Sequence, residues 1–304
     1  MAVYVCRRCD HSQDTLWEGQ CPSCAGLYRF KKQGVDTAMQ GNLTTMGGSK
    51  HKSAYVYLST GNPGFDHVLG GGFVAGRVVL LGGFAGTGKT RALLGIADYI
   101  AKTQGVVIYA SGEESTDDIA GVCAQLGLVN DRVVLLGSQQ SVEKVLELAK
   151  KMKAFLVIYD SAQKFASDYS AGTPGSGAQC KAVGEAIKTH CGQTKTCAVV
   201  VNQMSGQGDL KGGTELEHHC DTIMILAYPK EDDESAPTAE GIRVLAGSKN
   251  RVGEENQNAY FRMRGKEEEN PGTLEHVPAR SRLIVEPGRG KYRKKSDDED
   301  DDSN

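Results

Sequence analysis

A glycine-rich stretch near residue 85 constrains the fold of this chain more than any other feature. An apolar run from Val79 leads into Gly83-x-x-x-x-Gly88-Lys89-Thr90, and apolar residues at helical spacing follow. A strand, a glycine-rich turn and a helix in this order form a P-loop, whose backbone N–H groups and helix N-terminus surround a phosphate. A glycine-rich turn can also be a simple connection, so the flanking strand and helix are what favour phosphate binding.

The P-loop motif predicts which groups contact a nucleotide. Lys89 would reach the β- and γ-phosphates, and the Thr90 hydroxyl would bind Mg²⁺. We therefore expect ATP and Mg²⁺ as ligands. The expected binding segment is Gly83, Phe84, Ala85, Gly86, Thr87, Gly88, Lys89, Thr90 and Arg91.

Composition indicates a soluble globular protein. Of the 304 residues, 24% are charged and 39% are hydrophobic, and no apolar run reaches the roughly 20 residues of a membrane span. There is no signal-peptide pattern at the N-terminus, so we expect a cytoplasmic protein with no membrane partner. The net charge is −3, and leaving out the six acidic residues at 297–302 gives −3 + 6 = +3. A mildly basic body permits nucleic acid binding without requiring it.

Four cysteines near the N-terminus have the spacing of a metal site. Two CxxC pairs lie within the first 24 residues, and their thiolates suit a tetrahedral Zn²⁺ site. Two disulfides or a redox CxxC are the alternatives, and the expected cytoplasmic setting disfavours both. We predict a zinc ribbon at residues 1–32 and a flexible linker at 33–54. The expected ligands are Cys6, Cys9, Cys21 and Cys24.

The rest of the chain predicts an α/β domain at residues 55–265. Short apolar runs alternate mostly with helical stretches, which favours a parallel sheet covered by helices on both faces. Residues 266–304 form a C-terminal extension, in which a basic block precedes an acidic, disordered tail that could dock a partner. The expected strands are 106–110, 155–159, 197–201, 222–226 and 242–245, and the expected helices include 142–152 and 180–190.

Polar residues follow three of the expected strands. Asp160 ends one of them, where a carboxylate can order the shell of Mg²⁺. Glu113 and Glu114 follow another, where a carboxylate can orient and deprotonate a water molecule. The alternative is that these glutamates only begin a helix capped by Ser115. Gln203 ends the third strand, as a sensor of the γ-phosphate or as a solvent-facing amide.

The pieces together resemble the bacterial RadA (Sms) family of RecA-like ATPases. The resemblance covers residues 1 to 264 in family order. The segments that carry it are the four-cysteine ribbon with 17–24, the P-loop, and segments 59–61, 68–72, 111–115, 216–218 and Lys249-Asn-Arg-Val-Gly253. A P-loop alone names only a superfamily, whereas a ribbon before it and a KNRVG segment after it name this branch.

The resemblance implies roles for particular residues. Glu113 would be the general base, and Asp160 would complete the metal site. Lys249 and Arg251 would enter the site of a neighbouring subunit, in a ring of about six copies. Single-stranded DNA would contact segments 167–179 and 205–213, with Lys211 on phosphate.

The chain also departs from the family pattern. Gln203 stands where the family usually has His, and Gly206 stands where it has Lys. The family's Lon-protease-like domain has no counterpart, because residues 265–304 are too few for a domain. We expect a DNA-dependent ATPase for translocation or branch migration in recombinational repair or replication. The alternative is a nucleotide-switched DNA-binding assembly factor in which hydrolysis is incidental.

Overall fold

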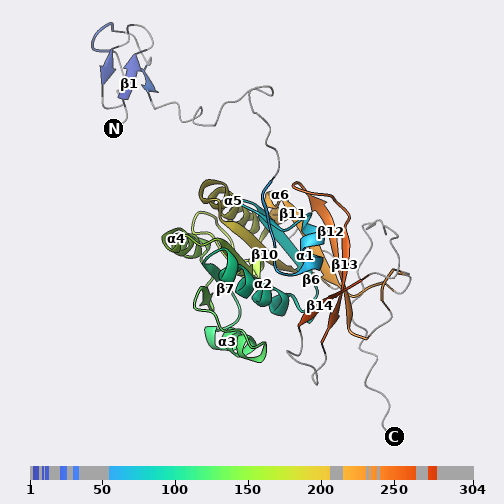
Figure 1. Ribbon diagram of the computed structural model, residues 1–304. Coiled ribbons are helices and arrows are strands. Elements are labelled where there is room, and N and C mark those ends of the chain that lie inside the picture. The colour runs from blue at the N-terminus through green and yellow to red at the C-terminus, as the bar shows by residue number, and fades with distance from the viewer. Residues whose placement is uncertain are drawn as a thin grey trace. The chain divides into compact units, whose positions relative to one another are not determined.

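The computed structural model describes residues 3–6, 9, 11–13, 21–25, 30–33, 55–205, 215–230, 233, 235–237, 240–264 and 273–278. The chain divides into two compact units, Met1–Ala54 and Tyr55–Asn304 (Figure 1). Lys211, Gly206, most of the predicted linker and the acidic tail lie outside the described residues.

The first unit contains a small antiparallel sheet. Strand β1 (Val3–Cys6) lies between β2 (Ser12–Gln13) and β3 (Phe30–Gln33). Cys6 is the last residue of β1 and pairs with Phe30.

The second unit is built on a nine-stranded sheet with the order β14-β13-β12-β11-β6-β10-β9-β7-β8. Strands β11, β6, β10, β9, β7 and β8 run parallel, whereas β12, β13 and β14 extend the sheet in antiparallel fashion. The strands are β6 (Val78–Gly83), β7 (Val107–Ser111), β8 (Val133–Leu136), β9 (Leu156–Asp160), β10 (Cys197–Gln203), β11 (Thr222–Ala227), β12 (Ile242–Asn250), β13 (Asn258–Met263) and β14 (Leu274–Val277).

Helices cover both faces of this sheet, and alternate strand residues pack against each set (Figure 1). Leu81 and Tyr109 face one apolar cluster with α1, α2 and α3, whereas Leu80 and Ile108 face the other with α4, α5 and α6. The helices are α1 (Pro63–Leu69), α2 (Lys89–Thr103), α3 (Thr116–Gln125), α4 (Val142–Met152), α5 (Gly177–Thr194), α6 (Glu215–His219) and the 3-10 turn η2 (Ala162–Lys164). A two-stranded sheet, β4 (Tyr57–Leu58) with β5 (Phe73–Val74), precedes β6.

The mostly parallel sheet flanked by helices confirms the predicted fold class. One strand differs from the prediction of a short strand at 242–245 in a parallel sheet. Strand β12 runs antiparallel to β11 and continues to Asn250. The sheet also continues beyond residue 265, because Leu274–Val277 pair with β13. A short apolar run does not encode strand direction, so the sequence pattern could not separate these cases.

A buried carboxylate fixes the amino-terminal edge of the parallel strands. Asp221 is 0% exposed and accepts a hydrogen bond from the backbone N–H of Val78 at 2.9 Å. It also pairs with Arg77 at 3.3 Å and with Lys188 of α5. Because charged hydrogen bonds are stronger than neutral ones, Asp221 joins β11, β6 and α5 at the base of the sheet.

Candidate nucleotide site and cysteine cluster

The P-loop lies at the carboxyl edge of the parallel strands, between β6 and α2. Gly83 has a φ of +156°, and a Cβ there would lie 2.4 Å from the carbonyl oxygen of Leu226 in β11. Gly88 caps α2 with a φ of +98°, a left-handed conformation that disfavours other residues. Close strand packing and the left-handed cap therefore require glycine at these two positions of the motif.

Lys89 folds back onto its own loop. Its ammonium group donates hydrogen bonds to the carbonyl oxygens of Gly83 at 2.9 Å and Phe84 at 2.7 Å. Burial lowers the pKa of Lys89 to about 8, although the charge of Asp160 acts in the opposite direction. A buried ammonium group with only carbonyl partners is a favourable position for an anionic ligand.

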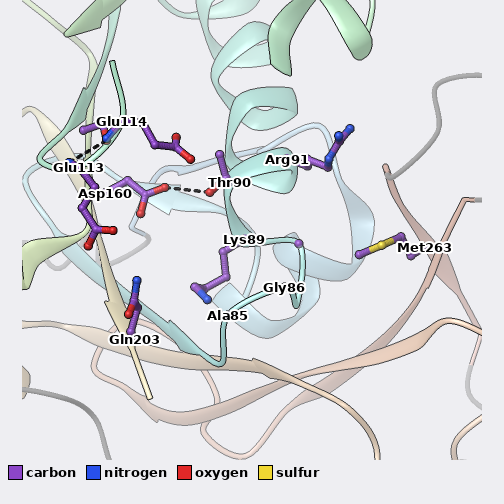
Figure 2. Close-up of a pocket in the computed structure, with 12 residues that line it drawn as sticks. Ala85, Gly86, Lys89, Thr90, Arg91, Glu113, Glu114, Asp160, Gln203 and Met263 are labelled. Carbon is purple, nitrogen blue, oxygen red and sulfur yellow. Dashed lines mark hydrogen bonds between the residues drawn. The ribbon is translucent and has the colours of Figure 1, made fainter. Parts of the chain in front are cut away.

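The predicted nucleotide residues surround one cavity of about 340 Å³. In Figure 2, Glu113, Asp160 and Gln203 lie on one side of Lys89, and Arg91 and Met263 lie on the other. The residues lining the cavity are Ala85, Gly86, Gly88, Lys89, Thr90, Arg91, Ser111, Glu113, Glu114, Asp160, Gln203 and Met263. Residues from β7, β9 and β10 meet here because the carboxyl ends of parallel strands share one edge.

Asp160 accepts two hydrogen bonds on the same oxygen. The Thr90 hydroxyl lies 3.0 Å from Asp160 Oδ2 (Figure 2), and the Tyr109 hydroxyl lies 2.5 Å from it. Burial, and then the charge of Asp160, raise the pKa of Tyr109 well above its ordinary value, so the phenol stays protonated and donates. Tyr109 was absent from our sequence prediction, because its contact depends on the register of β7 against β9.

Glu113 and Glu114 both line the cavity but have different surroundings. Glu113 Oε1 accepts a hydrogen bond from Ser161 at 3.2 Å and lies 3.8 Å from Lys164 Nζ. Glu114 has a raised pKa, because of burial and then the charge of Asp160. The predicted helix cap is present: Ser115 and Asp118 form a capping box, and the helix begins at Thr116, after both glutamates. Capping therefore does not account for the position of either glutamate in the cavity.

Lys249 and Arg251 lie at the opposite edge of the sheet from the P-loop. The strand pairing places Asn250 level with Thr222, and Thr222 level with Val79. Gly83 is four residues further along β6, roughly 13 Å away along the strand. Lys249 donates to the carbonyl oxygen of Glu217 at 2.9 Å. The structure therefore does not bring these two cations to the nucleotide cavity of their own chain.

Asn250 shapes the turn that presents these two cations. It is 6% exposed and donates to the carbonyl oxygen of Leu69 at 3.1 Å. Its side-chain oxygen accepts from the Thr222 hydroxyl and the backbone N–H of Val252, both at 3.1 Å. The sequence pattern predicts no role for Asn250, although this residue lies between Lys249 and Arg251.

The four N-terminal cysteines form one cluster, with all sulfur atoms within 4.8 Å of one another. The Sγ atoms of Cys6 and Cys24 are 3.7 Å apart, as are those of Cys9 and Cys21. Ligands at the usual Zn–S bond length of ~2.3 Å on a tetrahedron would be about 3.8 Å apart. A disulfide bond is about 2.05 Å long, so at separations of 3.7 Å neither of these sulfur pairs forms one. The cluster therefore fits Zn²⁺.

Comparison with known sequences identifies homologues. Residues 58–134 match the family model of the KaiC ATPases. A protein named DNA repair protein RadA from Aquifex aeolicus is 30% identical over 288 residues, which cover 93% of this chain and 61% of the relative. The RadA protein of Haemophilus influenzae is 28% identical over 86% of this chain and 57% of its own length. The chain thus spans about three fifths of the length of these relatives.

Solved structures confirm the fold. A KaiC-like protein from Pyrococcus horikoshii matches with a TM-score of 0.58 and 20% identity, over 74% of this chain and 100% of the other. A DnaB-like replicative helicase matches with a TM-score of 0.60 and 16% identity, over 74% of this chain and 63% of the other. These matches show a RecA-like ATPase fold, and the family match and the homologues support the prediction of an ATP hydrolase. Among the described residues, no helix has the length and apolar character needed to span a membrane.

The cysteine cluster makes a prediction about metal content. We expect one zinc ion per chain in purified protein, measured by elemental analysis, and loss of that zinc in Cys21→Ser. Cys197→Ser is the matched control, because Cys197 is a buried thiol of the sheet far along the chain and should keep the zinc content unchanged. A cluster that stays metal-free while the first unit is folded would contradict the assignment.

The burial of Lys89 predicts that nucleotide binding is accompanied by proton uptake. Above pH about 8 the buried amine of the free protein is largely neutral, because burial lowers its pKa. A phosphate beside it would favour the ammonium form, so binding of ADP without Mg²⁺ at pH 8 should take up about half a proton. Calorimetry in buffers of different ionisation enthalpy measures this uptake.

Lys89→Arg is the matched variant for this measurement. Arginine remains charged at pH 8, so it should still bind ADP but without the proton uptake attributed to Lys89. Equal uptake by both proteins would show that another group titrates.

Proposed function

We propose that this homologue of the RadA proteins is a DNA-dependent ATPase that binds single-stranded DNA and uses hydrolysis for translocation or branch migration. The observation that carries the proposal is the single cavity that Lys89, Thr90, Glu113, Asp160 and Gln203 share. A phosphate-binding lysine, a hydroxyl and carboxylate pair for Mg²⁺, a general base and a terminal amide are the parts that phosphoryl transfer requires.

Each residue has a defined role in this reaction. Lys89 would leave its carbonyl partners and bind the β- and γ-phosphates, and Thr90 with Asp160 would hold Mg²⁺, which offsets charge on the phosphates. Glu113 would take a proton from the attacking water molecule. The oxygen of this water would bond to the γ-phosphorus, while the bond from the γ-phosphorus to the oxygen bridging the β- and γ-phosphates breaks. Gln203 would hydrogen-bond the γ-phosphate. Tyr109 would keep Asp160 oriented through the hydrogen bond at 2.5 Å.

A complete site would require two copies of the chain. Lys249 and Arg251 lie at the sheet edge opposite their own P-loop. This position supports the proposal that they act on a neighbouring copy. Burial, and then the charge of Arg251, lower the pKa of Lys249, although the carboxylates of Asp221 and Glu217 act in the opposite direction. Cations supplied by a second copy would stabilise charge on the transferred phosphoryl group. We infer a head-to-tail homo-oligomer, with six copies as the expected closed ring.

The DNA-dependent part of the proposal is supported by the homologues named DNA repair protein RadA. In the sequence, segments 167–179 and 205–213 come after β9 and β10, whose carboxyl ends border the cavity, and we propose that DNA contacts both segments. Lys211 is proposed to contact phosphate. The zinc ribbon or the acidic tail would dock replication or repair proteins. In the alternative proposal, an assembly factor, nucleotide binding would change only the oligomer state.

ATP turnover with and without single-stranded DNA tests this function. We expect DNA to stimulate wild-type turnover and Lys89→Ala to abolish turnover, because the phosphates lose their main cation. Glu113→Gln should reduce turnover by roughly 100-fold or more while nucleotide still binds, because an amide cannot accept the proton. Glu147→Gln is the matched control, because Glu147 is an exposed residue of α4 that does not line the cavity. Turnover that DNA does not affect would favour the assembly factor.

Mixed assemblies test the contribution of the second copy. Arg251→Ala and Lys89→Ala should each be inactive alone, because each removes a different half of a shared site. Mixing the two proteins should restore a fraction of wild-type turnover, since some interfaces then combine two intact halves. If mass spectrometry shows mixed assemblies and turnover remains absent, Arg251 does not act across the interface.

A further inference from the structure

Tyr169 is the most exposed large hydrophobic side chain among the described residues. It is 89% exposed, and it belongs to the segment between η2 and α5. Leaving an aromatic ring in water forgoes the stabilisation that burial would provide, so a ring presented to solvent on an ordered support is a candidate contact surface.

The support of Tyr169 is ordered by buried hydrogen bonds. Gln179 is 2% exposed, accepts from the backbone N–H of Ser167 at 2.8 Å and donates to the carbonyl oxygen of Ser170 at 2.6 Å. On the other side, Glu143 of α4 accepts from the Ser167 hydroxyl at 2.6 Å. The Ser167 hydroxyl in turn accepts from the backbone N–H of Tyr169 at 3.2 Å. The backbone around Tyr169 is therefore tied to both α4 and α5 while its ring points outward.

The same segment is connected to the nucleotide cavity. It begins directly after η2, and Lys164 at the end of η2 lies 3.8 Å from Glu113. Ser161, just before η2, donates to Glu113 at 3.2 Å. A ligand that contacts Tyr169 would therefore bind a few residues away from the groups that hold the proposed general base.

The charge of this segment indicates which part of a nucleic acid it can contact. Between residues 165 and 179 the sole charged side chain is Asp168, which repels phosphate. No cation of this segment can pair with a phosphate, so the group of a nucleic acid that suits the exposed ring of Tyr169 is a base. Bases of a duplex are already stacked on each other, whereas those of a single strand offer a free face to an aromatic ring.

We propose that Tyr169 stacks on a base of single-stranded nucleic acid and is the main base contact of this surface. The inference rests on the proposed function and adds a residue and a mode of binding to it. The competing occupant of an exposed ring is a second copy of the chain, and the experiment below separates the two.

Binding of fluorescent oligo(dT) to Tyr169→Ala, measured by anisotropy at several salt concentrations, tests the proposal. We expect an affinity about 5- to 100-fold lower than wild type, because stacking on one base is lost. The salt dependence should keep its slope, since no phosphate contact is removed. Tyr169→Phe should bind as wild type does, because the aromatic ring that stacks is kept. Val129→Ala is the matched control, because Val129 is also highly exposed, at 86%.

Tyr169→Trp adds a direct reading of stacking. Its fluorescence should be quenched by oligo(dT), and by oligo(U) if the surface also accepts RNA, but not by a blunt duplex. Wild-type affinity in Tyr169→Ala, or a changed oligomer state with unchanged DNA affinity, would overturn the inference and leave the proposed function intact. Failure of the wild-type protein to bind any single-stranded oligonucleotide would overturn both.

Discussion

The pairing of β6 with β10 on one side and β11 on the other is the constraint on which the nucleotide site depends. The register of β6 places Gly83 level with Gln203 of β10 on one side and with Leu226 of β11 on the other. The P-loop therefore begins between these two residues. The approach of the Leu226 carbonyl to Gly83 is possible only without a side chain at that position. At the other end of the same strands, Asp221 hydrogen-bonds the backbone of Val78 and secures the same register. A slip of one residue would reverse the faces of β6 and separate Lys89 from Asp160.

Local sequence was sufficient for much of this site. The P-loop is a continuous segment, and Asp160, Glu113 and Gln203 each follow an apolar run whose end is readable in the sequence. Their meeting in one cavity follows from a rule about parallel strands and needs no knowledge of side-chain contacts. The four cysteines were equally readable, because tight CxxC turns bring each pair of sulfur atoms together.

Other features depended on information that one-dimensional patterns lack. Tyr109 reaches Asp160 across two strands, and Asn250 reaches Leu69 across 181 residues of chain. The direction of β12 was also hidden, because an apolar run has the same appearance in a parallel and an antiparallel strand. Lys249 and Arg251 were identified by family resemblance alone. They lie at the far edge of the sheet from their own P-loop, and their action on a neighbouring copy stays a prediction.

The separation of Lys249 and Arg251 from their own P-loop has a consequence for how many working centres an assembly contains. If every centre takes its last cations from the next copy, an open row always has a terminal copy whose centre is unfinished, however long the row becomes. Closing the row into a ring removes that defect at once. The final subunit to join would then complete two centres, its own and that of its neighbour. ATP turnover would therefore rise by two centres when the ring closes.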